Sequence, residues 1–144
     1  MIQLMVFLIG VALLHAKWEE SIEGDAGWAK NLPCWRLSNW ISNLVIGKEI
    51  TGYHVYMLLL FAALFHGAFL FKPWSIRMEF FIWSAYCWYW VIEDFCYFIV
   101  HKSFGIKKFK RGCIAWHRRW IIIPVSYWIG ILLGLCLYWL GGAL

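Results

Sequence analysis

The sequence predicts an all-α protein, an integral membrane bundle of about four transmembrane helices with an interfacial segment after the first. Its composition is 63% hydrophobic and 15% charged, whereas soluble domains are about 45–50% apolar and about 25% charged. Apolar runs of about 20 residues, each long enough to cross a hydrocarbon core of about 30 Å, recur along the chain. The length of 144 residues predicts a single membrane domain over 1–144.

Four apolar runs have the length of a membrane span, at residues 2–23, 53–71, 74–100 and 121–144. The first run lacks the positive flank and cleavage site of a signal peptide, so we expect a retained helix. No Gly or Pro interrupts that helix between Gly10 and Gly24. Residues 24–51 are rich in Gly and Trp, which predicts a loop plus a short helix lying at the membrane interface.

The basic residues orient these spans. Eleven of the 13 Lys and Arg residues lie in 17–51 and 101–120, so the positive-inside rule places both loops in the cytoplasm and both termini outside. Basic side chains beside a membrane favour contact with anionic lipids and need no nucleic-acid partner. The residues expected to make this lipid or anion contact are Lys107, Lys108, Lys110, Arg111, Arg118 and Arg119.

This topology brings acids and histidines to one depth in the membrane. His15, Glu19 and Glu23 form an i, i+4, i+8 stripe on the first helix. The third span contains the segment WVIEDFCYFIVH, with two adjacent carboxylates in an apolar helix. Imidazoles and carboxylates converging from several helices predict a transition-metal site for iron, manganese or zinc. The expected ligands are His15, Glu19, Glu23, Glu93, Asp94, His101 and His117.

Structural alternatives to metal binding remain open at this point. Glu93 and Asp94 would also be explained by pairing with tyrosine hydroxyls and with Arg118, Arg119 or Lys102, or by a proton or ion pathway. The stripe on the first helix would equally suit a solvated turn. His54, at a helix start, suits a cap or surface group, and His66 suits a hydrogen bond to a neighbouring helix. Neither Glu-x-x-His pairs nor the histidine boxes of membrane hydroxylases occur in the chain.

Several short motifs in the chain resemble those of a group of known sequences. They are the acidic EG and GWA-x-x-LP near the start, followed by ED, FG-x-x-F, WH and P-x-x-YW, and they extend over about two-thirds of the chain. This pattern resembles small, uncharacterised prokaryotic multi-span membrane proteins. The resemblance implies a multi-span fold and a prokaryotic plasma membrane, and it implies no established activity.

Two functions follow as expectations. The first is a small membrane enzyme that binds one or two metal ions on the cytoplasmic side and acts on a lipid-soluble substrate, with its catalytic residues unknown. The alternative is a non-catalytic accessory subunit of a larger membrane complex, because 12 Trp, 7 Tyr and 11 Phe offer much rigid contact surface. A third hypothesis is a component of a transporter or of a proton relay. Gly130 and Gly134 have the small-xxx-small spacing of a helix contact, and a homo-oligomer would use it.

Overall fold

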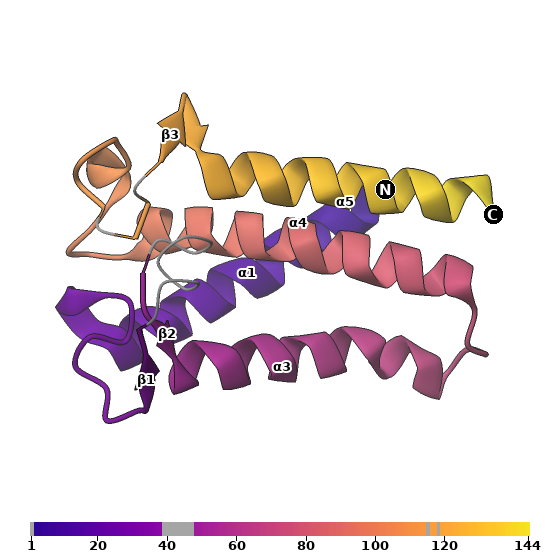
Figure 1. The fold of residues 1–144 in the computed structure, drawn as a ribbon, viewed down its shortest axis with the longest axis horizontal. Coiled ribbons are helices and arrows are strands. Elements are labelled where there is room, and N and C mark those ends of the chain that lie inside the picture. Colours follow the sequence, from indigo (N-terminus) through magenta and orange to yellow (C-terminus); the bar gives the residue numbers. More distant parts are fainter. Residues whose placement is uncertain (1, 39–47, 115, 118) are drawn as a thin grey trace.

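A computed structural model describes residues 2–38, 48–114, 116–117 and 119–144. Four long helices form a bundle, α1 (Ile2–Glu23), α3 (Gly52–His66), α4 (Ile76–Val100) and α5 (Val125–Ala143). They alternate in direction, so both termini lie at one end and the described parts of the 24–51 and 101–124 connections lie at the other (Figure 1). The expected all-α bundle is confirmed.

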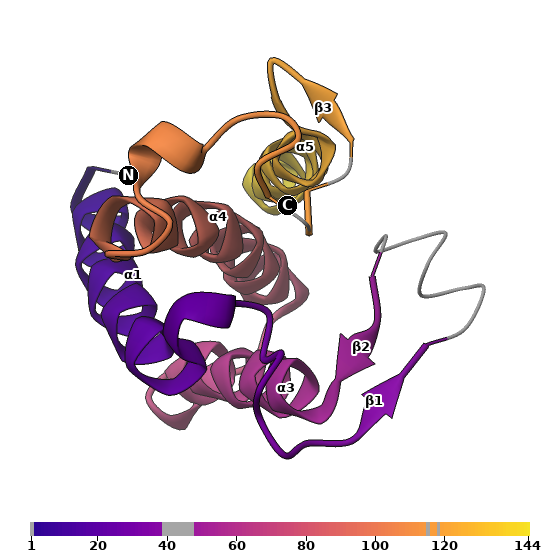
Figure 2. The same ribbon diagram turned by 90° about the vertical axis from the view of Figure 1, so that its left-hand side faces the viewer.

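Three segments in the described part of the chain are long and apolar enough to cross a membrane, Ile2–Ala26, Gly52–Leu70 and Val125–Ala143. These contain α1, α3 and α5. The fourth helix, α4, is about 37 Å long at a rise of about 1.5 Å per residue, but it carries charged residues near both ends. It lies at the centre of the bundle, packed against α1, α5 and, less extensively, α3 (Figure 2).

Small residues bring α5 close to α4. A side chain at Gly130 would meet Val91, and one at Gly134 would overlap the Trp88 indole. At this contact the Ser84 hydroxyl donates to the Gly134 carbonyl at 2.7 Å. The close approach that the small-xxx-small spacing predicts is therefore made within one chain, and a homo-oligomer through these glycines stays a prediction.

The connection after α1 folds back over the end of the bundle. It contains the 3-10 turn η1 (Gly24–Ala26) and the strand β1 (Arg36–Leu37), which pairs antiparallel with β2 (Ile50–Thr51). Trp28 and Ala29 adopt left-handed backbone conformations, with φ of 51° and 50°. Such conformations cost about 1–3 kcal/mol each and persist only where surrounding contacts hold them. A short interfacial helix was expected within 24–51; residues 39–47 of that segment lie outside the described residues, and the rest of it contains the turn η1 and the strands β1 and β2.

Hydroxyl side chains cap the next two helices. Thr51 accepts from the His54 amide at the start of α3, and Ser75 accepts from the Met78 amide at the start of α4. The 3-10 turn η2 (Gly67–Leu70) follows α3, and η3 (Ile106–Lys108) follows α4.

The last helix begins later than the expected residue 121. Strands β3 (Trp120–Ile121) and β4 (Ile123–Pro124) form a tight antiparallel turn, with Ile122 at a φ of 67°. Pro124 therefore immediately precedes α5, which begins at Val125.

Candidate metal centre

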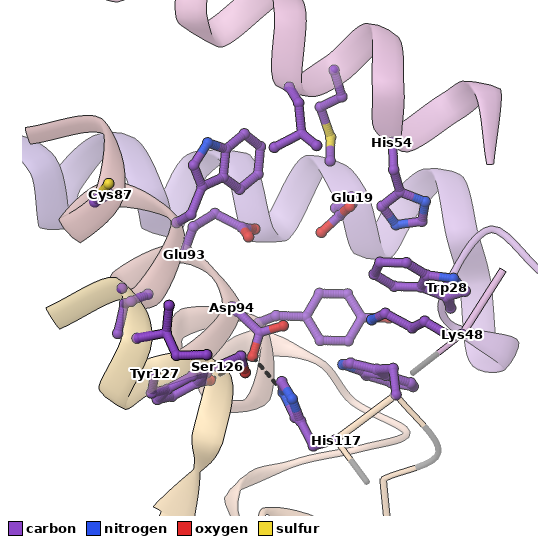
Figure 3. A pocket seen from close by; sticks show the side chains of 18 of the residues that line it. Glu19, Trp28, Lys48, His54, Cys87, Glu93, Asp94, His117, Ser126 and Tyr127 are labelled. Carbon is purple, nitrogen blue, oxygen red and sulfur yellow. Dashed lines mark hydrogen bonds and ion pairs between the residues drawn. The ribbon is translucent and has the colours of Figure 1, made fainter. Parts of the chain in front are cut away.

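A cavity of about 490 Å³ lies at the end of the bundle that carries the connections. All four helices contribute to its walls, and its volume is within the range of small-molecule sites. Most of the lining surface is apolar. The charged side chains in the lining are Glu19, Glu23, Lys48, Glu93 and Asp94 (Figure 3). The lining also contains the imidazoles of His54 and His117 and the hydroxyl groups of Tyr86, Tyr97, Ser126 and Tyr127.

Glu19, Glu23 and His54 form a compact group of side chains that could hold a metal ion. One ligand atom from each lies within 4.8 Å of the other two, and all three residues are buried. Helix α1 places the two carboxylates one turn apart on one face, and the first turn of α3 supplies the imidazole. The Thr51 hydroxyl lies 2.6 Å from His54 Nδ1, which leaves His54 Nε2 directed towards Glu23 Oε1 at 3.5 Å. Fixing one ring nitrogen in this way is how proteins orient a ligating histidine.

The Glu23 carboxylate is held by two other donors. The Ala29 amide donates to its Oε1 at 2.5 Å, and the Tyr97 hydroxyl lies 3.5 Å from its Oε2. The left-handed turn at Trp28 and Ala29 makes the first of these bonds, because it returns the chain to the end of α1. The strained turn therefore serves to fix one carboxylate of the group.

Glu93 faces the same cavity from α4. Its side chain is 3% exposed, and its Oε1 has no hydrogen-bond partner among the described residues. The nearest imidazole nitrogen, His15 Nδ1, is 3.7 Å away and instead lies 2.9 Å from the Tyr89 hydroxyl. Buried carboxylate oxygens are nearly always partnered in native proteins, so Glu93 Oε1 is available to accept a hydrogen bond from a protonated Glu19 carboxyl or to bind a cation.

Asp94, the next residue, belongs to a different group. Its Oδ2 accepts a hydrogen bond from the Tyr127 hydroxyl at 2.5 Å and lies 2.8 Å from His117 Nε2. Figure 3 shows this group on the α5 side of the cavity, away from Glu19 and His54. The structure thus divides the expected ligands into two sets on different walls.

Lys48 reaches the cavity from the connection before α3. Its Nζ lies 2.8 Å from the centre of the Trp28 ring and 5.8 Å from that of Trp116. Burial lowers the pKa of the Lys48 ammonium group well below its usual value, while the negative charges of Asp94, Glu23 and Glu19 oppose that change. Trp28 in turn stacks on the His54 ring, with centroids 3.8 Å apart. The Trp28 ring thus contacts both the Lys48 side chain and the His54 imidazole, and the Trp116 ring lies on the Lys48 side chain as well.

The other expected ligands lie outside the cavity. His15 sits behind Glu93, with its Nε2 3.2 Å from the Met57 sulfur. His101 Nε2 lies 3.0 Å from the Gly24 carbonyl, and its Nδ1 accepts from the Ser103 and Phe104 amides. Both nitrogens of His101 are therefore used to join two connections, and the structure does not bring this residue to the other ligands.

The structure supports some of the structural alternatives to metal binding and contradicts others. Asp94 does pair with a tyrosine hydroxyl, whereas Lys102 is exposed and uses its backbone amide to bind Glu20. The stripe of His15, Glu19 and Glu23 is buried and is not a solvated turn. At the far end of the bundle His66 pairs with Glu79 of α4 at 3.1 Å, as expected for a bond to a neighbouring helix. Arg118 lies outside the described residues.

Two residues of the site were missing from the sequence-based ligand set. His54 lies three residues after a capping threonine, and its depth matched that of the other ligands, but that pattern equally fits a surface residue. Lys48 carried no signal, because its position depends on the path of the connection. Of the expected lipid contacts, Lys107, Lys108, Lys110, Arg111 and Arg119 are exposed.

The chain matches no protein-family model, and neither a curated protein nor a solved structure is significantly similar to it. Its class follows from the fold and the site. It is a small helical membrane protein with a buried carboxylate and imidazole group at one end of its bundle.

Proposed function

We propose that this protein is a small metal-dependent membrane enzyme that acts on a lipid-soluble substrate. The observation that carries the proposal is the convergence of Glu19, Glu23 and His54 within 4.8 Å. Two carboxylates and one imidazole suit iron, manganese or zinc. Catalytic metal sites typically have three protein ligands, which leaves a coordination position for water or a substrate oxygen.

The charge balance of the cavity supports a bound cation. Four carboxylates, Glu19, Glu23, Glu93 and Asp94, face it, and Lys48 is the one ammonium group among its described lining residues. Uncompensated buried charge is strongly destabilising. A divalent ion beside Glu19 would offset most of this excess and would provide a partner for the orphaned Glu93 oxygen.

The cavity walls suggest how the chemistry is divided. A bound metal would polarise a substrate oxygen or activate a water molecule. His117, oriented by Asp94, lies on another wall of the same cavity, where it can accept or donate a proton. Because the Tyr127 hydroxyl also donates to Asp94, the carboxylate that orients the His117 imidazole is itself held in place. This arrangement separates ligand residues from a candidate acid or base.

Elemental analysis tests this proposal. Protein purified without chelators and incubated with Fe²⁺, Mn²⁺ or Zn²⁺ is expected to retain about one ion per chain, and Glu23→Gln or His54→Gln to retain at least about ten-fold less, since even outer-shell substitutions cost about 10–100-fold in affinity. Glu20→Gln is the matched control, because Glu20 lies on the same helix but binds Lys17 and Lys102. Folded wild-type protein that retains none of the three metals would overturn the proposal.

We also propose that the cavity end of the bundle faces the cytoplasm. The exposed Lys107, Lys108, Lys110 and Arg111 lie at that end, where they would contact anionic headgroups. The outward-facing Leu, Ile and Trp side chains suit lipid contact, so in the described part of the chain no surface favours an accessory subunit over an enzyme.

Cysteine labelling tests the orientation. In a Cys34→Ala, Cys136→Ala background, a membrane-impermeant maleimide is expected to label the exposed Cys113 in inverted vesicles and not in right-side-out vesicles. Adding Cys113→Ala and Ser75→Cys moves the thiol to the opposite end of the bundle and should reverse the pattern. Labelling of Cys113 from the outside would contradict the assigned orientation.

A further inference from the structure

The cavity continues beyond its polar groups into the membrane part of the bundle. Tyr86 also lines it, seven residues before Glu93 on α4 and therefore about 10 Å deeper. Along this stretch the walls are formed by Leu58, Val91 and Ile129, with no charged side chain among them. The cavity therefore has a polar end and an apolar branch.

The apolar branch reaches the outer surface between α3 and α5. Leu58 is 40% exposed and Ile129 is 61% exposed, yet both also line the cavity. They lie in segments that are long and apolar enough to cross a membrane, so their exposed faces would meet hydrocarbon. The extensive packing among the described helices joins α4 to α1 and to α5, and α3 makes no comparable contact with α5. Among the described residues, no packing between α3 and α5 closes this side of the cavity.

Neighbouring contacts fix the borders of this opening. The Tyr86 hydroxyl donates to the Leu58 carbonyl at 2.9 Å and so joins α4 to α3 at the deep end. On the other border Gly130 has no side chain, and a Cβ there would meet Val91. The opening is therefore part of the packed bundle, with α4 as its back wall.

Charge at the polar end limits the head group that the cavity accepts. With Glu19, Glu23, Glu93 and Asp94 all ionised around a divalent metal, even a protonated Lys48 leaves the cavity net negative. An anionic head group would be repelled, and a cationic one would compete with the metal. An uncharged hydroxyl or carbonyl oxygen can take the open coordination position without either cost.

We propose that the substrate is a single-chain lipid with an uncharged oxygen head group, which enters sideways between α3 and α5. Its head group lies at Glu19 and His54, and its chain runs past Val91 to Ile129. The head-group assignment rests on the proposed metal-dependent function, whereas the sideways route depends only on the shape and lining of the cavity.

Photocrosslinking tests both parts of this inference. Three diazirine probes share one hydrocarbon chain and end in a hydroxyl, a carboxylate or an amine, and each is added to metal-loaded protein in lipid nanodiscs. The hydroxyl probe is expected to label peptides containing Leu58, Val91 and Ile129 in a saturable way, and to label them more than the carboxylate probe does. Greater labelling by the carboxylate probe would overturn the head-group assignment.

A pair of tryptophan variants tests the route. Ile129→Trp would fill the opening and is expected to reduce the saturable labelling at least about five-fold, since the cavity is small. Leu132→Trp is the matched control, because Leu132 lies on the same helix and is 59% exposed without lining the cavity. Equal loss in both variants, or labelling spread evenly over the outer faces, would overturn the sideways route.

The metal measurement keeps the two proposals separate. If elemental analysis finds no metal while Ile129→Trp alone blocks labelling, the enzyme proposal fails and the lipid route stands. In that case the uncompensated carboxylates would favour the amine probe over the hydroxyl probe, and the head-group assignment would fail with the metal. If metal is retained but Ile129→Trp has no effect, only the route is overturned.

Discussion

Gly134→Leu is expected to lower the stability of the protein in detergent by about 3 kcal/mol, at the upper end of the usual cost of overpacking. The added side chain would occupy the space of the Trp88 indole. It would also separate Ser84 from the Gly134 carbonyl, and a buried polar group left without a partner adds to the cost. The helical circular dichroism signal, followed during heating or denaturant unfolding, measures this loss.

The matched control for this variant is Gly142→Leu. Gly142 lies on the same helix, and a Cβ there has no neighbour within 4 Å. Both variants gain the same side chain and the same helix propensity, so a difference between them reports the α4–α5 contact. Equal stability of the two variants would contradict the close packing of these helices.

Glu93→Gln is expected to raise the stability of the metal-free protein by about 1–3 kcal/mol, because it removes the cost of burying a carboxyl whose Oε1 has no donor among the described residues. The same substitution is expected to weaken metal retention, since it takes a negative charge from the cavity. Thermal unfolding with and without a chelator measures both effects. A gain in stability together with a loss of metal retention would mean that Glu93 serves metal binding. A residue that holds the bundle together would lose stability on substitution.

Glu20→Gln provides the comparison for Glu93→Gln. Glu20 is paired with Lys17 near the surface, and exposed ion pairs contribute about 0–1 kcal/mol. Its substitution is expected to change stability little under either condition. A Glu93→Gln variant that is less stable than wild type in the chelator would mean that the Glu93 carboxylate is already compensated within the chain.

The sequence predicted the fold because apolar run length directly reports the helices of a membrane protein. The main deviation, the later start of α5, arises from the turn formed by β3 and β4. That turn places four β-region residues around Ile122 where the apolar run continues without interruption. Hydrophobicity does not distinguish such a turn from a helix start.

The sequence predicted how far along its helix each site residue lies, but not the direction in which each side chain points around the helix axis. Glu19 and Glu23 fall on one stripe, as their spacing predicts, and the structure adds that this stripe is buried against the cavity. His101 stands seven residues after Asp94, which suggested a shared face, but it is the residue that follows the last residue of α4, and its side chain turns to the Gly24 carbonyl. Lys48 and His54 joined the site through tertiary packing, which no local pattern records.

Glu93 and Asp94 are successive residues of α4, yet they face different walls of the cavity. Successive side chains of a helix are about 100° apart around its axis, so Glu93 lies by His15 while Asp94 binds His117 and Tyr127. A rotation of α4 about its own axis would move both carboxylates together. A movement of α4 as a rigid helix therefore cannot reposition one of these carboxylates and leave the other in place.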